Sequence, residues 1–201
     1  MTPSVLISCI TRSEIHSETV RWLLDQQHPV DIVCSKYTIE HQRNWQVERF
    51  LERDEDYLFM VDADVVPKKG TVEELLKHVT PSTILVAPPY AFADDPHETV
   101  VMAYRRLANG RYQHVPHVNG LLEIDGTGMS GALLPRSVFH DVAKPWFKML
   151  HDDDGKLRVT EDFYFWENVQ RAGYRIKAHL GLVADHLKPV YLSFLPENNG
   201  Y

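Results

Sequence analysis

Two aspartates with one residue between them offer the clearest chemistry in this sequence. Asp62 and Asp64 follow the apolar run 57–61, and Pro67 comes shortly after them. A buried strand that ends on carboxylates brings acceptor oxygens to the rim of a sheet, where α/β proteins bind ligands. Such oxygens suit a hard divalent cation, which could bridge to the phosphates of a nucleotide. The pair could also begin a solvated turn, because Asp is common in turns.

Three further groups could act together with this pair. Glu161 and Asp162 stand where a helix is expected to begin with Thr160 as its cap, and His186 follows the apolar run 182–184. Acids at a helix N-terminus can simply be partners of the helix dipole. A histidine after a strand can likewise be structural. The joint pattern is more specific than any of its members.

The spacing of apolar residues predicts the elements that position these side chains. Short apolar runs, typical of strands buried on both faces, lie at 4–10, 30–34, 57–61 and 83–87. Helical patterns begin between them, near Ser17, Ile39 and Thr71. Strands that alternate with helices predict an α/β fold with a mostly parallel sheet and helices on both of its faces.

Two of these helices allow more detailed predictions. In the first, Val20, Leu23 and Leu24 are expected on the buried face. The third begins with 71–74, Thr-Val-Glu-Glu, which has the pattern of a capping box. In that motif the threonine and glutamate side chains bind the free N–H groups of the first turn.

The middle of the chain changes character. Segments 111–118 and 121–125, joined by Asn119-Gly120, predict an antiparallel hairpin with a small second sheet. His114 and His117 within it are expected to be ordinary strand histidines. The three glycines of 126–131 predict close packing of the backbone against a bound ligand.

The last third carries four expectations of its own. Trp146 and Phe147 are candidates for stacking on a sugar or acceptor, and equally for the core. A short helix is expected from Pro135 to Val142, and an exposed acidic turn at 151–155. A last strand is expected near 175–178, and the tail from Leu195 onward is expected to be irregular.

Composition indicates a soluble globular protein. The chain has 201 residues, 44% of them hydrophobic and 24% charged, and is long enough for a sizeable core. Its net charge of −7 argues against a sequence-independent grip on nucleic acid. No apolar run approaches the roughly 20 residues that span a bilayer, and no signal-peptide pattern precedes the first strand. Cys9 and Cys34 are expected to be buried free thiols in a reducing, cytoplasmic setting.

A set of segments, taken in chain order, points to one family. They are Ile10-Thr11-Arg12, Gln42-Arg43-Asn44, 59–67, 126–129, Pro135-Arg136, 160–165, 171–174 and Asp185-His186. Together they resemble the GT-A fold glycosyltransferases, in particular family-two-like enzymes and their short single-domain relatives in bacteria and phages. The resemblance covers about residues 4–190. It implies a single GT-A domain over 1–201, with a nucleotide-binding half (about 1–90), an acceptor-binding and catalytic half (about 91–190) and a tail (191–201).

The resemblance assigns a metal site and a donor site. It implies that Asp64 binds the metal directly, that Asp62 contacts the ribose or a metal-bound water, and that His186 is the second protein ligand. The implied ion is Mn²⁺ or Mg²⁺, which stabilises the diphosphate leaving group. The remaining candidates for contact with the nucleotide sugar are Thr11, Arg12, Ser35, Arg43, Asn44 and Ala63.

The resemblance also assigns the proton transfer. Asp162 looks like the general base that takes a proton from the acceptor hydroxyl, with Glu161 as the competing candidate. The helix N-terminus is expected to favour the ionised form that a base needs. In-line attack would then invert the anomeric centre.

The resemblance gives only the class of the donor and of the acceptor. The resemblance favours a UDP-sugar over a GDP-sugar and a hydroxyl acceptor, with nucleic acid an improbable one. The chain ends within about 15 residues of His186. The acceptor site is therefore expected from the loops near 90–118 and 145–158, or from a partner subunit, and a homo-oligomer stays open.

Two other functions fit parts of the pattern. A nucleotidyltransferase shares the α/β sheet and the divalent metal, but its first loop usually carries glycines and a basic residue, whereas Ile10-Thr11-Arg12-Ser13 has no glycine. A nucleotide-sugar or metal binding module without activity would have no reason to keep both Asp162 and His186.

Overall fold

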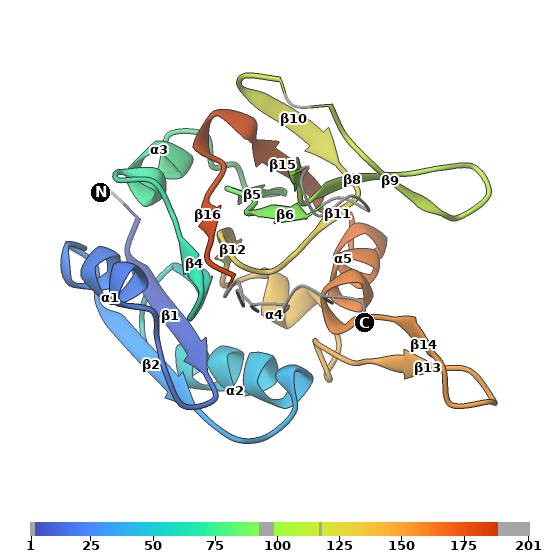
Figure 1. Ribbon diagram of the computed structural model, residues 1–201, viewed down its shortest axis with the longest axis horizontal. Coiled ribbons are helices and arrows are strands. Elements are labelled where there is room, and N and C mark those ends of the chain that lie inside the picture. Colours follow the sequence, from blue (N-terminus) through green and yellow to red (C-terminus); the bar gives the residue numbers. More distant parts are fainter. Residues whose placement is uncertain (1–2, 93–98, 117, 189–201) are drawn as a thin grey trace, which may run out of the picture.

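A seven-stranded mixed sheet forms the centre of the computed structural model, which describes residues 3–92, 99–116 and 118–188 (Figure 1). The strand order is β10-β15-β5-β12-β3-β1-β2. The bounds are β1 Val5–Thr11, β2 Val30–Cys34, β3 Tyr57–Asp62, β5 Thr83–Val86, β10 Leu121–Ile124, β12 Ala132–Pro135 and β15 Arg175–His179. Strands β12 and β10 run antiparallel to the others, so the sheet is mostly parallel.

Helices cover both faces of this sheet. Their bounds are α1 Ser17–Leu24, α2 Ile39–Leu51, α3 Thr71–Leu76, α4 Val138–Asp141 and α5 Glu161–Arg171. Side chains along a strand point alternately to its two faces. In β1, Leu6 packs with α2, α4 and α5, whereas Val5 and Ile7 pack with α1 and α3. The sheet therefore separates two cores, and both faces are apolar as the continuous runs predict.

Short strands outside the main sheet position the loops. They are β4 Val65–Val66 with β16 Asp185–His186, β6 Tyr90–Phe92 with β7 Thr99–Val101, β13 Leu150–His151 with β14 Leu157–Val159, and the sheet of β11 Gly126–Thr127, β8 Ala103–Arg106 and β9 Tyr112–His114. A 3-10 turn, η1 Leu180–Leu182, precedes β16. None of the helices in the described ranges has the length and apolarity needed to cross a bilayer.

The expected hairpin over 111–125 is wrong. Strand β9 pairs with β8 through the turn at 107–111, where Gly110 has φ 81°, while β10 joins the main sheet beside β15. Gly120 does adopt φ 100° as a turn residue. An alternating pattern identifies a strand but not its partner, which is why the pairing was misassigned. His114 is a strand residue as expected, with Nδ1 3.1 Å from the Val101 carbonyl, and His117 lies outside the described residues.

Two helix predictions also need correction. The buried residues of α1 are Thr19, Trp22 and Leu23, while Leu24 is 80% exposed and Val20 is 36% exposed. The buried face of α1 is therefore centred on Trp22, and it is rotated around the helix axis relative to the predicted face. No capping box opens α3, because Gly70 occupies the N-cap position in the left-handed region and the Thr71 hydroxyl donates to the Lys68 carbonyl (2.7 Å).

The glycine segment packs against the protein itself rather than a ligand. A Cβ at Gly131, whose φ is +86°, would lie 2.0 Å from the Ala87 carbonyl oxygen. A Cβ at Gly126 would lie 2.6 Å from the Phe163 ring. The glycines therefore allow close contact between β12 and β5 and between β11 and α5.

The aromatic pair at 146–147 belongs to the core. Trp146 and Phe147 are each 1% exposed, so neither can stack on an acceptor. The Trp146 indole donates to the Phe139 and Val142 carbonyls at 3.1 Å, and Phe147 stacks on Phe165 with ring centroids 4.7 Å apart.

The short helix, the two cysteines and the last third of the chain differ in part from the predictions. The short helix begins at Val138 rather than at Pro135, which ends β12. Strands β1 and β2 are neighbours and both thiols are free, but Cys34 is exposed while Cys9 is buried. The run 182–184 lies at the end of η1 and before β16 instead of forming a strand. The turn at 151–155 and the strand near 175–178 are present, and the tail from Leu195 lies outside the described residues.

Candidate functional site

The two aspartates lie at the carboxyl edge of the parallel strands. Strands β1 and β3 pair so that Ile10 lies beside Asp62, where β3 ends, and β1 ends one residue later at Thr11. Asp62 is held at this edge because its N–H donates to the Ser130 hydroxyl (3.0 Å). The pairing of β1 with β3 thus places the aspartates at the rim of the sheet, as the sequence predicts.

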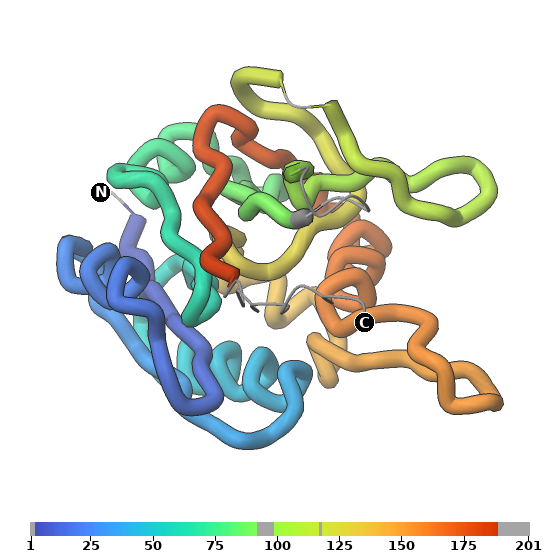
Figure 2. Tube along the Cα trace, in the orientation of Figure 1, coloured from blue at the N-terminus to red at the C-terminus, as the bar shows by residue number. Residues whose placement is uncertain are grey.

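A two-residue ribbon brings His186 to Asp64. Strand β16 pairs antiparallel with β4, so that His186 lies beside Val65, the residue after Asp64. Figure 2 shows the segment that carries β16, in red, running along the teal β4 segment. The Leu187 N–H donates to the Asp64 carbonyl (2.7 Å), and the His16 N–H donates to the Ala63 carbonyl (3.0 Å). The backbone of the aspartate pair is therefore fixed on both sides.

Asp64 forms the centre of a small charged cluster. Its Oδ2 accepts from the Lys188 ammonium at 2.8 Å and lies 3.2 Å from His186 Nε2. Burial raises the pKa of Asp64, but the contacts with His186 and Lys188 outweigh it and hold that pKa well below its usual range. Asp64 is therefore a carboxylate at any physiological pH.

His186 faces this carboxylate with its Nε2 atom. Its Nδ1 lies 2.9 Å from the Tyr90 carbonyl, which can only accept, so Nδ1 carries the proton. Nε2 is then the ring nitrogen that can donate to Asp64 Oδ2 or, without its proton, bind a cation that Asp64 also binds. A backbone carbonyl that fixes the tautomer behind a histidine is the usual arrangement around a metal ligand. The pair Asp64 and His186 therefore fits a divalent cation.

Arg43 lies under the site rather than in it. It is 3% exposed, and its NH2 group forms an ion pair of 2.6 Å with Asp62 Oδ1. Its Nε has no hydrogen-bond partner among the described residues. Helix α2 faces the sheet with polar as well as apolar side chains, and Gln46 of the same face donates to the Ser8 carbonyl (2.9 Å). In the structure Arg43 is the partner that positions Asp62, and its predicted contact with the nucleotide stays a prediction.

Asn44 and Ser35 also have contacts within the protein. The Asn44 amide accepts from the N–H groups of Trp146 (3.0 Å) and Phe147 (3.3 Å), and it donates to the Glu40 and Phe147 carbonyls at 2.8 Å. Two donors and two acceptances fill the capacity of an amide side chain, so the expected nucleotide contact of Asn44 is not supported. The Ser35 hydroxyl accepts from the Tyr37 N–H (3.1 Å) and is largely buried.

The other candidates for donor binding do meet around the aspartates. Two adjoining depressions of about 460 and 480 Å³ share Thr11, Arg12, Ala63 and Asp64. The first is also lined by Asp62, His186, Lys188, Ile10, Ile39 and Gln42. Arg12 is exposed there, whereas the Thr11 hydroxyl donates to the Glu14 carbonyl and shapes the loop. This edge therefore carries both basic and carboxylate side chains around two adjoining depressions.

The two acids of α5 lie at its first turn, as predicted. Asp162 Oδ1 accepts from the Phe163 N–H (2.8 Å) and from the Thr160 hydroxyl. Burial nevertheless raises the pKa of Asp162, against the lowering effect of these bonds and of Arg43. Burial and the Asp162 charge also raise the pKa of Glu161. The expectation that the helix N-terminus would dominate and favour the ionised form is therefore wrong, because burial outweighs it.

A larger cleft of about 640 Å³ adjoins the start of α5. Thr160 and Phe163, which flank the two acids in the sequence, line it. The rest of its wall comes from Glu167 of α5 and from two regions that contain short strands and their loops, through Arg106, Gly110, Tyr112, Leu150, His151, Asp152, Arg158 and Val159. Tyr112 and Phe163 make an edge-to-face contact with centroids 4.4 Å apart. The cleft thus combines aromatic surface with charges of both signs.

Comparison with known proteins gives a fold but no sequence relative. No protein-family model and no curated protein matches the sequence. The structure is similar to the crystal structure of A197 from STIV, with a TM-score of 0.67 and 17% identity over 98% of this chain and 100% of that one. It is also similar to GalNAc-T7 with UDP, GalNAc and Mn²⁺, with a TM-score of 0.66 and 9% identity over 100% of this chain.

A third similar structure is S. aureus TarS 1-349 in complex with UDP-GlcNAc, with a TM-score of 0.56 and 11% identity over 94% of this chain. The chain has the GT-A fold. The predicted fold class is therefore confirmed. This chain spans only 46% of the GalNAc-T7 chain and 60% of the TarS chain, and identities this low carry the fold alone.

Sequence reasoning missed two features of the site. Lys188, two residues after His186, contacts Asp64 directly. The Tyr90 carbonyl, which fixes the His186 ring, is a backbone group that no side-chain pattern could indicate. A basic residue close behind the Asp-His pair was the one available signal for Lys188.

Proposed function

We propose that this protein is a metal-dependent, family-two-like glycosyltransferase that moves a sugar from a nucleotide-sugar donor to an acceptor hydroxyl. The observation that carries the proposal is the facing of Asp64 and His186 at the carboxyl edge of a GT-A sheet. Structural neighbours bound to UDP with Mn²⁺ and to UDP-GlcNAc favour a UDP-sugar over a GDP-sugar. The donor is assigned to the half before about residue 90, beside Thr11, Arg12 and Ala63.

Asp64 and His186 would hold the ion, Mn²⁺ or Mg²⁺. A carboxylate oxygen and an imidazole nitrogen are ligands that Mn²⁺ accepts, and Asp62 stands one residue away to orient the ribose or a bound water. When bound, the cation supplies positive charge to the diphosphate leaving group. Lys188 adds a second positive charge on the same side of Asp64. Arg43 keeps Asp62 in place from below.

Asp162 is assigned as the general base. Thr160 and Phe163 occupy its Oδ1, which orients the carboxylate and leaves Oδ2 to take the proton. The acceptor oxygen forms a bond to the anomeric carbon, the bond from that carbon to the diphosphate breaks, and the proton passes to Asp162. Attack opposite the leaving group inverts the anomeric centre. A pKa raised by burial makes a carboxylate a stronger base near neutral pH.

We expect donor binding to be detectable first as thermal stabilisation. In a screen of UDP-, GDP- and dTDP-sugars with and without Mn²⁺, the UDP-sugars with Mn²⁺ should give the largest rise in Tm, because a ligand that binds the native state stabilises it. Release of nucleoside diphosphate is then measured for the donors that bind. Release of pyrophosphate would instead assign a nucleotidyltransferase, and binding without any turnover would assign a binding module.

The 640 Å³ cleft is assigned to the acceptor, because it adjoins Asp162 and draws on the loop regions 90–118 and 145–158. With p-nitrophenyl glycosides as acceptor probes, Arg158→Ala should raise the acceptor KM by roughly tenfold, the loss of one charged hydrogen bond. Donor hydrolysis without acceptor should not change. Arg105→Ala removes an exposed arginine of β8 outside the cleft and is the matched control. An unchanged acceptor KM in Arg158→Ala would place the acceptor elsewhere.

A further inference from the structure

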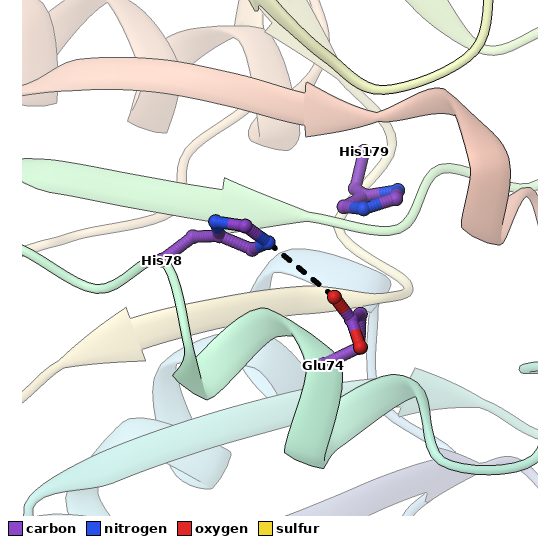
Figure 3. Close-up of side chains that lie close together, drawn as sticks. All are labelled: Glu74, His78 and His179. Atoms are coloured by element: carbon purple, nitrogen blue, oxygen red, sulfur yellow. Dashed lines mark ion pairs between the residues drawn. The ribbon is translucent and has the colours of Figure 1, made fainter.

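A second group of metal-ligating side chains lies between the end of α3 and the end of β15 (Figure 3). Glu74 belongs to α3, His78 follows four residues later just past the helix, and His179 is the last residue of β15. One donor atom of each residue lies within 4.8 Å of the others. The group shares no residue with the Asp64 site. All three side chains are half-buried.

The spacing of these donors suits a small transition-metal ion. Glu74 Oε1 lies 3.4 Å from His78 Nε2. Two ligands of a tetrahedral Zn²⁺ ion at about 2.1 Å from the metal lie about 3.4 Å apart. Glu74 and His78 therefore already have the separation that a shared ion requires, and a side-chain adjustment of His179 completes the triangle. Figure 3 shows the three side chains converging from two sides on one space.

His179 supplies an independent indication of a ligand. Its Nδ1 is buried and has no hydrogen-bond partner among the described residues. A buried polar atom without a partner in a native protein calls for a ligand, a water or a proton exchange that satisfies it. Gly181 lies against this ring, since a Cβ there would be 3.2 Å from His179 Cε1 and 3.4 Å from Nδ1. Glycine thus leaves the imidazole room to turn.

The two carboxylate oxygens of Glu74 have different partners. Lys77 Nζ contacts Glu74 Oε2 at 2.6 Å, which leaves Oε1 directed at His78. Two imidazoles and one carboxylate form a donor set that Zn²⁺ prefers, with the fourth position left for water. The same set is less suited to Mg²⁺, which favours oxygen ligands. The chemistry therefore separates this group from the Asp64 site.

We propose that Glu74, His78 and His179 bind one Zn²⁺-class ion that fastens α3 to the end of β15. A further contact holds the same region together, because Lys68 Nζ, just before α3, donates to the Gly181 carbonyl of η1 (3.1 Å). Strand β16, which carries His186, follows directly. The ion thus acts as a structural clamp on the segment that leads to the candidate active site, and its binding does not depend on the proposed transferase function.

The test uses the full chain in the Asp64→Asn background, which removes the other metal site. After treatment with EDTA, titration with Co²⁺ should give visible d–d absorption that saturates at one equivalent, and Zn²⁺ should displace it. Tm should rise with Zn²⁺ concentration. His179→Gln and His78→Gln should each weaken Zn²⁺ binding, measured by calorimetry, at least roughly 100-fold, because each removes one of three ligands.

His28→Gln is the matched control. His28 Nε2 lies 3.5 Å from Glu73 Oε1, so this histidine from the segment between α1 and β2 pairs with a glutamate of α3 without belonging to the three-residue group. Zn²⁺ affinity and the Zn²⁺-dependent rise in Tm should be unchanged in it. Equal Zn²⁺ affinity in the parent and in both His78→Gln and His179→Gln would assign the binding to other surface histidines and overturn the proposal. Because two variants are measured, the test still gives a result if one of them fails to fold.

Discussion

Asp64→Asn should lower nucleotide-sugar turnover roughly a thousandfold, an energy of about 4 kcal/mol in the transition state. The reason is that both His186 and Lys188 contact the Asp64 carboxylate. An asparagine keeps the shape of the side chain but removes the charge that would hold a cation. Release of nucleoside diphosphate measures the effect, and the electron paramagnetic resonance signal of bound Mn²⁺ gives a readout that does not depend on activity.

The control for this variant is Asp185→Asn. Asp185 is an exposed acid one residue before His186 on the same short strand, and its side chain points away because neighbours on a strand alternate. Mn²⁺ binding and turnover should therefore stay at the parent level. Turnover that is independent of metal, or full activity in Asp64→Asn, would contradict the proposed site.

The sequence predicts the nucleotide half of the fold well because its signals are local. Buried parallel strands appear as continuous apolar runs, and the strands predicted at 4–10, 30–34 and 57–61 lie within one residue of β1, β2 and β3. Their parallel order then places the ends of β1 and β3 on one edge without further information. For the same reason Asp62 and Asp64 could be assigned to the sheet rim from the sequence.

The pairings in the second half depend on information that a single sequence does not contain. Strand β10 has the alternation of a hairpin strand, yet its partner is β15, more than fifty residues later in the chain. The ribbon of β4 and β16 is two residues long on each side, which is too short for any period to appear. It is nevertheless the contact that brings His186 to Asp64.

The roles of individual polar residues were harder to predict for an energetic reason. A polar residue on a helix is normally taken as exposed. In α2, however, Gln42, Arg43 and Gln46 are all buried, because the loop after β2, Asp62 and the backbone of β1 supply their respective partners. Burying a charge is tolerated only when it is paired. The partner lies nineteen residues away in the chain, so the sequence alone could not indicate that Arg43 is buried against Asp62.

Asp162→Asn should reduce sugar transfer about 10²- to 10⁴-fold while leaving donor and metal binding unchanged, which is the range for loss of a general base. An asparagine Oδ1 can still accept from the Phe163 N–H and the Thr160 hydroxyl, so the start of α5 keeps its contacts. Thermal shift with UDP-sugar and Mn²⁺ tests the binding, and transfer to acceptor tests the chemistry.

The pH dependence of transfer supplies a second test. A base must be ionised before it reacts, so the rate falls as pH drops through the pKa of that group. Burial raises the pKa of Asp162, and the acid limb of the rate profile should therefore lie above the value near 3.9 of an ordinary aspartate. This limb should disappear in Asp162→Asn, whose remaining activity no longer depends on that proton.

The pH dependence of folding stability that Asp162 contributes should be opposite to the pH dependence of the transfer rate. A carboxyl whose pKa is raised on folding has its ionised form disfavoured in the native state, so its contribution to stability improves as pH falls through that raised pKa. Asp162→Asn removes a buried charge and should unfold in urea at the same or a higher midpoint at neutral pH. Glu161 is the competing candidate for the base, and burial raises its pKa as well. Normal transfer in Asp162→Asn together with its loss in Glu161→Gln would move the base by one residue, to Glu161.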